Sequence, residues 1–367
     1  MRKEQISWWR TYLGEEEAQA SAAAIRDGHL SRGPLTAFLE SELAEQLGVP
    51  HAVLVPSGSM GLLLALMALD VGPGDEVIVP DLTWIATAHA ASVLGAKVVL
   101  VDCEAERPLL DVKAVEAAIT PRTKAILPVH LAGRAVPLDE LRALAKSRGI
   151  AIVEDAAQAF ASRTPEGPLG TLGDIGIFSL GVAKLVSTGQ GGIVVTKDDE
   201  LAQRLRDASW HGVRNGDEEA YVRLGMNMKF SDVLAAVGRQ QLRRLGAKTA
   251  HVRAVYERYR DGLADVPGIE VEPIDLASGE LPLWTEVRCD DRDGVREALA
   301  AVGIETHLPH RPLHHAPHLK DGAADAAFPN AERHARELLI LPSGPAQSIT
   351  NVDRVINALT KRALAVA

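Results

Sequence analysis

The chain has 367 residues, of which 47% are hydrophobic and 24% charged, and its formal net charge is −10 at pH 7. This length and composition predict a globular protein with a large domain and a smaller one. The net negative charge argues against nucleic acid or an anionic membrane as the main partner, so local features would have to hold any anionic ligand.

The first residues carry no apolar segment typical of a secretory signal, and no uncharged apolar run approaches the roughly 18 residues that a membrane-spanning helix needs. Cys103 and Cys289 are too few and too far apart to indicate a disulfide framework. These features predict a cytoplasmic location.

Short β-branched runs alternate with helical patterns in the first two thirds of the chain. This alternation predicts an α/β fold whose mostly parallel mixed sheet lies between helices. Helices are expected over 14–28, 35–47, 60–69, 84–94, 112–119, 138–148, 199–208 and 231–244. Strands are expected over 52–55, 76–80, 96–102, 125–128, 151–154, 175–179 and 192–196. The polar segment 211–226 is expected to be a loop.

The sequence changes in character after Gly246. The elements expected here are a helix over 249–263, strands near 268–272 and 283–289, a helix over 292–302, a His- and Pro-rich loop over 305–319, and a terminal helix over 351–364. We therefore expect a large domain of residues 1–245 and a smaller C-terminal α/β domain of residues 246–367.

A carboxylate and an amine lie at or just beyond the ends of two expected strands. Asp155 closes one apolar strand, and Lys184 follows another between apolar neighbours. The aspartate could simply cap a helix, and a loop lysine is usually solvated. Together, however, they suit pyridoxal phosphate, which needs a lysine for its aldehyde and an acid for its ring nitrogen. Gln158, one helical turn beyond the aspartate, could reach the phenolic oxygen of this cofactor.

The turn after the first expected strand offers a phosphate site. Ser57, Gly58 and Ser59 precede a helix, where backbone N–H groups and the helix dipole favour an anion. One of these serines could instead be an ordinary N-cap. Ser179 adds a hydroxyl at another strand end. Trp84 begins a helix at a further strand end, where it could stack on the cofactor ring or belong to the core.

The His- and Pro-rich loop contains His310, Arg311, His314, His315 and His318. Part of this spacing is typical of metal ligands, but the prolines prevent a regular helix and no acidic or cysteine ligand lies nearby. We therefore expect no metal site, and instead a loop that faces the substrate.

At these residues the chain resembles the DegT/DnrJ/EryC1/StrS family of sugar aminotransferases, which are fold-type I enzymes that use pyridoxal phosphate. The resemblance extends over nearly the whole chain. The segments that carry it are 14–17, 33–34, 57–59, 71–80, 119–125, 128–131, 154–158, 173–174, 179–184, 211–212 and 225–232.

The resemblance implies a role for each matching residue. Lys184 would form the Schiff base and carry the proton between substrate Cα and cofactor C4′. Asp155 would pair with the pyridinium nitrogen, and Gln158 would contact the phenolic oxygen. The other implied cofactor contacts are Trp84 at the ring, Gly58, Ser59, Met60 and Ser179 at the phosphate, and Asn227 at the phosphate of the neighbouring subunit. The candidate substrate contacts are Ser31, Lys229, His310 and Arg311. A homodimer with shared active sites follows from the implied role of the asparagine.

We therefore expect a transaminase that moves an amino group from an amino acid, by resemblance L-glutamate, to a keto sugar that is nucleotide-linked. Members of the family also act on keto-cyclitols, and no residue separates the two acceptors. A further alternative is a cofactor-binding sensor or scaffold, against which the set of Lys184, Asp155 and Gln158 argues. A nicotinamide-dependent enzyme is excluded, because no Gly-x-Gly-x-x-Gly follows the first expected strand.

Overall fold

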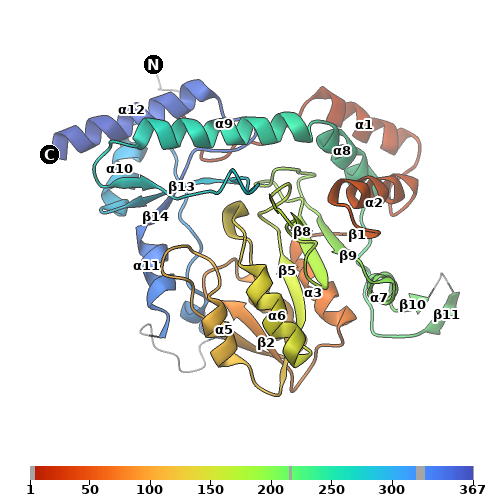
Figure 1. Ribbon diagram of the computed structural model, residues 1–367. Coiled ribbons are helices and arrows are strands. Elements are labelled where there is room, and N and C mark those ends of the chain that lie inside the picture. Colours follow the sequence, from red (N-terminus) through yellow and green to blue (C-terminus); the bar gives the residue numbers. More distant parts are fainter. Residues whose placement is uncertain (1–4, 215–216, 320–326, 367) are drawn as a thin grey trace.

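A seven-stranded mixed sheet forms the centre of the larger part of the molecule (Figure 1). The computed structural model describes residues 5–214, 217–319 and 327–366. In sheet order, the strands are β1 (His51–Val55), β9 (Gly192–Thr196), β8 (Ile175–Ser179), β5 (Ala151–Asp155), β4 (Thr123–Ile126), β2 (Glu76–Pro80) and β3 (Lys97–Val101). β9 pairs antiparallel with β1 and β8, whereas β8, β5, β4, β2 and β3 pair in parallel with their neighbours in that order. This mostly parallel mixed sheet confirms the predicted fold class.

Helices cover both faces of the sheet because its strands alternate their side chains between two cores. Val53 and Val55 belong to the core that contains α3, whereas Ala52 and Leu54 belong to the core that contains α2. The helices of this part are α1 (Glu15–Arg26), α2 (Pro34–Leu47), α3 (Gly58–Ala68), α4 (Ala86–Val93), α5 (Val112–Ala118), α6 (Leu138–Arg148), α7 (Asp199–Ser209) and α8 (Asp232–Arg243), with the 3₁₀ turn η1 (Leu131–Gly133). Within the described ranges, no helix is both long and apolar enough to cross a membrane.

A smaller antiparallel sheet is built from the C-terminal part of the chain. Its strands are β12 (Ile269–Val271), β13 (Thr285–Cys289) and β14 (Leu338–Leu341). The helices of this part are α9 (Leu245–Leu263), α10 (Arg292–Ala301), α11 (Pro329–Glu337) and α12 (Ile349–Val366), with the 3₁₀ turn η2 (Leu313–His315). α9 and α12 pack side by side along one side of the molecule (Figure 1). Ile6 packs against apolar residues of β13 and β14 and forms a β-bridge with Ile304, so the N-terminal segment also contacts this sheet.

Three segments differ from the sequence predictions. α11 and β14 occupy a region for which the sequence analysis predicted no element. The supposed loop 211–226 contains the hairpin of β10 (Val213–Arg214) and β11 (Asp217–Tyr221), which projects from the body of the molecule (Figure 1). A second small hairpin joins β6 (Arg163–Thr164) to β7 (Gly167–Pro168). The expected domain division near residue 245, where α9 begins, stays a prediction.

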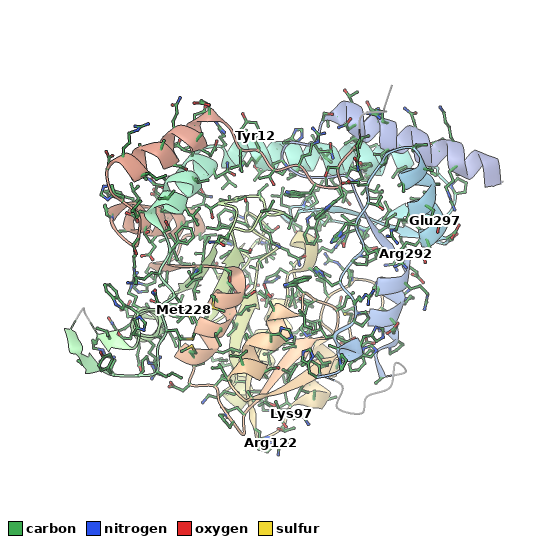
Figure 2. All side chains as sticks on the ribbon, turned by 180° about the vertical axis from the view of Figure 1, so that it is seen from behind. Tyr12, Lys97, Arg122, Met228, Arg292 and Glu297 are labelled. Carbon is green, nitrogen blue, oxygen red and sulfur yellow. The ribbon has the colours of Figure 1, made fainter. Side chains whose placement is uncertain are left out.

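The carboxyl ends of the parallel strands meet at one edge of the large sheet. Lys97 and Arg122, at the amino ends of β3 and β4, lie together at the opposite edge (Figure 2). Ser57, Asp81 and Asp155 lie at the carboxyl ends of β1, β2 and β5. Because open α/β sheets bind ligands outside the carboxyl ends of their strands, the candidate site is expected at this edge.

Candidate active site

Asp155, the last residue of β5, provides a buried carboxylate. Its Oδ2 accepts a hydrogen bond from Thr87 Oγ1 at 2.8 Å, and its Oδ1 accepts one from the backbone N–H of Ala157 at 3.1 Å. A turn rather than a helix follows, so the interpretation as a helix cap is wrong. Burial raises the pKa of Asp155, while the hydrogen bonds and the charge of Lys184 act in the opposite direction. A cation placed against this carboxylate would favour its ionised form.

Lys184 lies in the loop between β8 and β9, and its side chain is partly buried. Its Nζ lies 5.2 Å from the centre of the Trp284 ring. Burial lowers the pKa of the amine to about 8, although the nearby carboxylate of Asp155 raises it. Because a larger share of this amine is unprotonated near neutral pH, Lys184 is a better nucleophile than an exposed lysine.

Gln158 connects the turn after β5 to the His-rich loop. Its Oε1 accepts a hydrogen bond from the backbone N–H of Ala132 at 2.8 Å, and its Nε2 lies 3.1 Å from Nε2 of His310. Burial, together with the charge of Lys184, lowers the pKa of His310 to about 3. The imidazole is therefore neutral at pH 7, and its unprotonated nitrogen can accept a hydrogen bond from the amide of Gln158.

Trp84 lies two residues before α4, not in its first turn as predicted. Its side chain is 60% exposed, so the interpretation as a core residue is wrong. The indole ring lies 5.6 Å from the ring of His310, with 59° between the ring planes. The exposed indole face of Trp84 therefore lies beside His310, which contacts Gln158.

The amino end of α3 meets the end of β8. Ser57 Oγ accepts a hydrogen bond from the backbone N–H of Met60 at 3.1 Å, so Ser57 is the N-cap of the helix. A Cβ atom at Gly58 would lie 3.2 Å from Cβ of Ser179, a tight contact that would require Ser179 to move slightly. The first turn of α3, with Ser59, and the hydroxyl of Ser179 therefore lie together at the positive end of a helix, where an anion is favoured.

Asn227 and Lys229 lie near Trp210, and Ser31 lies beside the start of α8. Asn227 Oδ1 accepts a hydrogen bond from the backbone N–H of Lys229 at 3.3 Å, and Lys229 Nζ lies 4.9 Å from the centre of the Trp210 ring. The backbone carbonyl of Ser31 accepts a hydrogen bond from the first residue of α8 at 3.2 Å. Among the described residues, no contact within one chain joins these residues to Asp155.

A cavity of about 780 Å³ opens beside Trp84 and His310. Its walls are the turn after β2, the His-rich loop, the start of α10 and one side of α11, and three arginines line it: Arg292, Arg311 and Arg336. Arg292, labelled in Figure 2, donates a hydrogen bond to a backbone carbonyl of α11 at 2.7 Å. Arg292 also pairs with Asp293 at 2.9 Å and Arg336 with Glu337 at 3.7 Å, so Arg311 supplies most of the local positive charge that an anionic ligand needs in a chain of negative net charge.

Two residues of the site were missed by the sequence analysis. Thr87, which donates to Asp155, follows Trp84 by one helical turn, so the spacing of the two could have suggested it. Trp284, whose ring lies near Lys184, comes from the segment before β13. Nothing in the local sequence indicates that contact, because only the packing of the C-terminal part against the large sheet creates it.

An acidic group lies beside the histidines, contrary to the expectation on which a metal site was excluded. Glu332 of α11 packs against the His-rich loop. Its Oε1 lies 2.6 Å from Nε2 of His315 and 3.1 Å from Nε2 of His314. Because α11 was not predicted, this acid could not be placed beside the histidines from the sequence.

The seven-stranded, mostly parallel mixed sheet is that of a fold-type I aminotransferase. The model of the DegT/DnrJ/EryC1/StrS aminotransferase family matches residues 11–360, and the chain belongs to that family. It is an aminotransferase, so the alternative of a sensor or scaffold without transferase activity is dismissed.

Solved structures agree with this assignment. DesV from S. venezuelae, solved in complex with a ketimine intermediate, is 38% identical with a TM-score of 0.90, over 95% of this chain and 94% of that one. The aminotransferase TlmJ from Streptoalloteichus hindustanus is 33% identical with a TM-score of 0.94, over 99% and 100%. The putative sugar aminotransferase Spr1654 from Streptococcus pneumoniae, solved in PLP and PMP forms, is 27% identical with a TM-score of 0.92 for both. Each of these two matches covers 99% of this chain, with 99% of the PMP-form chain and 100% of the PLP-form chain.

Proposed function

We propose that the chain uses pyridoxal phosphate to transfer the amino group of an amino acid, L-glutamate, to a nucleotide-linked keto sugar. The observation that carries the proposal is the desolvated amine of Lys184 in the electrostatic field of the buried carboxylate of Asp155. The PLP and PMP forms of Spr1654, and its description as a putative sugar aminotransferase, support the cofactor and the acceptor class.

The groups at the site fit this cofactor. The amine of Lys184 suits an aldehyde, and the carboxylate of Asp155 suits a pyridinium nitrogen. The amide of Gln158 can donate to a phenolic oxygen, and the first turn of α3 beside Ser179 suits a dianionic phosphate. Trp84 offers its indole face for a ring. Each of these groups lies at the carboxyl edge of the sheet or in the loops beside it.

When bound, pyridoxal phosphate supplies an electron-withdrawing ring that weakens the Cα–H bond of an amino acid. The residues of the chain would supply the rest. Asp155 holds the proton on the ring nitrogen, and its burial strengthens that ion pair. Lys184 Nζ takes the proton from Cα of the donor, which its low pKa permits near neutral pH. Gln158 and the neutral ring of His310 form one side of the site without adding charge.

The cavity beside Trp84 supports a nucleotide-linked acceptor over a keto-cyclitol. It adjoins His310 and carries Arg292, Arg311 and Arg336 in its walls. Guanidinium groups bind phosphate oxygens through paired charge-assisted hydrogen bonds, whereas a cyclitol offers no phosphate to them. Ser31 and Lys229 lie elsewhere in one chain, so we propose them as substrate contacts only across a subunit interface.

A panel of acceptors tests the substrate. Nucleotide-linked 3-keto sugars, nucleotide-linked 4-keto sugars and a keto-cyclitol are each incubated with the pyridoxamine form of the enzyme, and mass spectrometry detects the aminated product. We expect amination of one class of nucleotide sugar and none of the cyclitol. Amination of the cyclitol alone would contradict the proposed acceptor and leave the reaction class intact.

We also propose a homodimer in which Asn227 completes the site of the neighbouring subunit. The exposed apolar side chains after β10 support this, because Tyr221, Leu224 and Met226 are 71%, 76% and 48% exposed in one chain. Co-expressed Lys184→Ala and Asn227→Ala chains test it. In a mixed dimer with shared sites, one site carries both changes and the other carries none, so activity returns. If each site were contained in one chain, every mixed dimer would stay inactive.

We propose a cytoplasmic location. Cys103 and Cys289 are both buried free thiols, which suits a reducing compartment.

A further inference from the structure

We propose that His314, His315 and Glu332 form a binding site for a zinc ion at the wall of the cavity beside Trp84. His315 and Glu332 line the cavity proposed for the acceptor, but neither they nor His314 has a role in the proposed proton transfer. It rests on the convergence of three ligand atoms, on the hydrogen bonds that fix one histidine, and on the position of the acid.

The three potential ligand atoms converge on one point. The two histidine nitrogens and a carboxylate oxygen of Glu332 all lie within 4.8 Å of one another. Oε1 of Glu332 is 3.1 Å from Nε2 of His314 and 2.6 Å from Nε2 of His315. Ligands at about 2.0–2.1 Å from a tetrahedral zinc lie roughly 3.4 Å from each other, so small side-chain shifts would accommodate the ion.

Among the residues that the structure describes, no group donates a well-aligned hydrogen bond to Oε1 of Glu332. This oxygen is buried, and both imidazole nitrogens are close to it. An oxygen that lies near two nitrogens without a hydrogen bond to either is explained if all three atoms are directed at a cation between them.

His314 is held as metal-binding histidines usually are. Its Nδ1 lies 2.7 Å from Oδ2 of Asp81, and its backbone N–H donates to Oδ1 of the same carboxylate at 2.8 Å. Its ring also stacks on Phe328, with 4.7 Å between the ring centres and 18° between the planes. A carboxylate on Nδ1 fixes the orientation of the ring, so that Nε2 points at Oε1 of Glu332, and it makes the imidazole a stronger ligand.

The ligand set favours zinc and leaves a coordination position open. Two imidazoles and one carboxylate suit zinc, whereas magnesium and calcium prefer oxygen ligands alone. The side chains of His315 and Glu332 are 42% and 28% exposed, and both line the cavity. The fourth position would therefore face the cavity, where water or an oxygen of a bound ligand could occupy it.

Metal analysis of the untagged holoenzyme tests the proposal. The protein, with its cofactor bound, is treated with a chelator, dialysed against zinc chloride and analysed for zinc per chain. We expect one zinc ion per chain in the parent enzyme, and at least a tenfold weaker affinity in Glu332→Gln and in His315→Ala. The matched control is His318→Ala, because His318 Nε2 lies 2.8 Å from Nε2 of His89, so this variant removes a histidine of the same loop from outside the proposed site.

Unchanged zinc affinity in Glu332→Gln or His315→Ala, weaker affinity in His318→Ala, or no zinc in the parent enzyme would each overturn the proposal. Cofactor absorbance and the thermal midpoint of each variant show that the protein is folded. Because zinc is counted directly, failure of this proposal is distinguishable from failure of the proposed transamination.

Discussion

The low pKa of Lys184 predicts the pH dependence of cofactor attachment. An ordinary lysine has a pKa near 10.4, whereas burial lowers that of Lys184 to about 8. At pH 7 this difference raises the unprotonated fraction of the amine roughly two- to three-hundredfold, to about a tenth of the molecules. Because only the unprotonated amine attacks an aldehyde, the rate of Schiff-base formation should rise with pH to a plateau, with its midpoint near 8.

Stopped-flow absorbance of cofactor-free enzyme mixed with pyridoxal phosphate measures this rate from pH 6 upward. Reduction with borohydride followed by peptide mapping then locates the label. Lys248 is an internal control, because burial also lowers its pKa to about 8, yet its Nζ is enclosed and donates to the carbonyl of Leu185 at 3.1 Å. A midpoint near 10.4, or a label on Lys248, would refute the reasoning.

Three further predictions concern charge at the site and in the interior. Asp155→Asn should lower the turnover number about 10²- to 10³-fold in steady-state assays, because the ring nitrogen loses its ionic partner; retained turnover would contradict this role. Arg311→Ala should raise KM for a nucleotide-linked acceptor about tenfold or more while the glutamate half-reaction stays unchanged, and an unchanged KM would exclude the cavity as the acceptor site. Arg134 is fully buried and paired with Glu286 of β13, so Arg134→Ala should lower the free energy of unfolding by about 3–5 kcal/mol. Replacing the exposed Arg258 by alanine should lower it by about 1 kcal/mol or less. Urea denaturation compares the two variants, and equal losses would contradict the difference expected from burial.

The large sheet could be predicted from the sequence because its strands are short apolar runs separated by clear turn residues. The C-terminal part lacked such signals. α11 ends at Glu337 and β14 begins at Leu338, so no turn residue separates the helix from the strand. The hairpin of β10 and β11 was missed because Asp217–Tyr221 is mostly polar and shows no alternation.

The candidate site shows the same contrast between residues that the local sequence indicates and residues that only the fold brings together. Asp155 and Lys184 could be predicted as candidate site residues because Asp155 closes one apolar strand and Lys184 follows another, and the edge of a parallel sheet brings such positions together. Trp284 and Glu332 could not be found, because they reach their partners only through packing between elements distant in the sequence. Local pattern therefore identified the residues on the sheet, and tertiary structure was needed for those that complete the walls of the site.

The donor half-reaction tests the central claim most directly. Purified enzyme carrying pyridoxal phosphate is mixed with L-glutamate and no acceptor, and 2-oxoglutarate is quantified together with the cofactor absorbance. We predict one 2-oxoglutarate per active site, conversion of the cofactor to its pyridoxamine form, and neither change in Lys184→Ala. Release of 2-oxoglutarate by the Lys184→Ala enzyme at the parent rate would contradict the account.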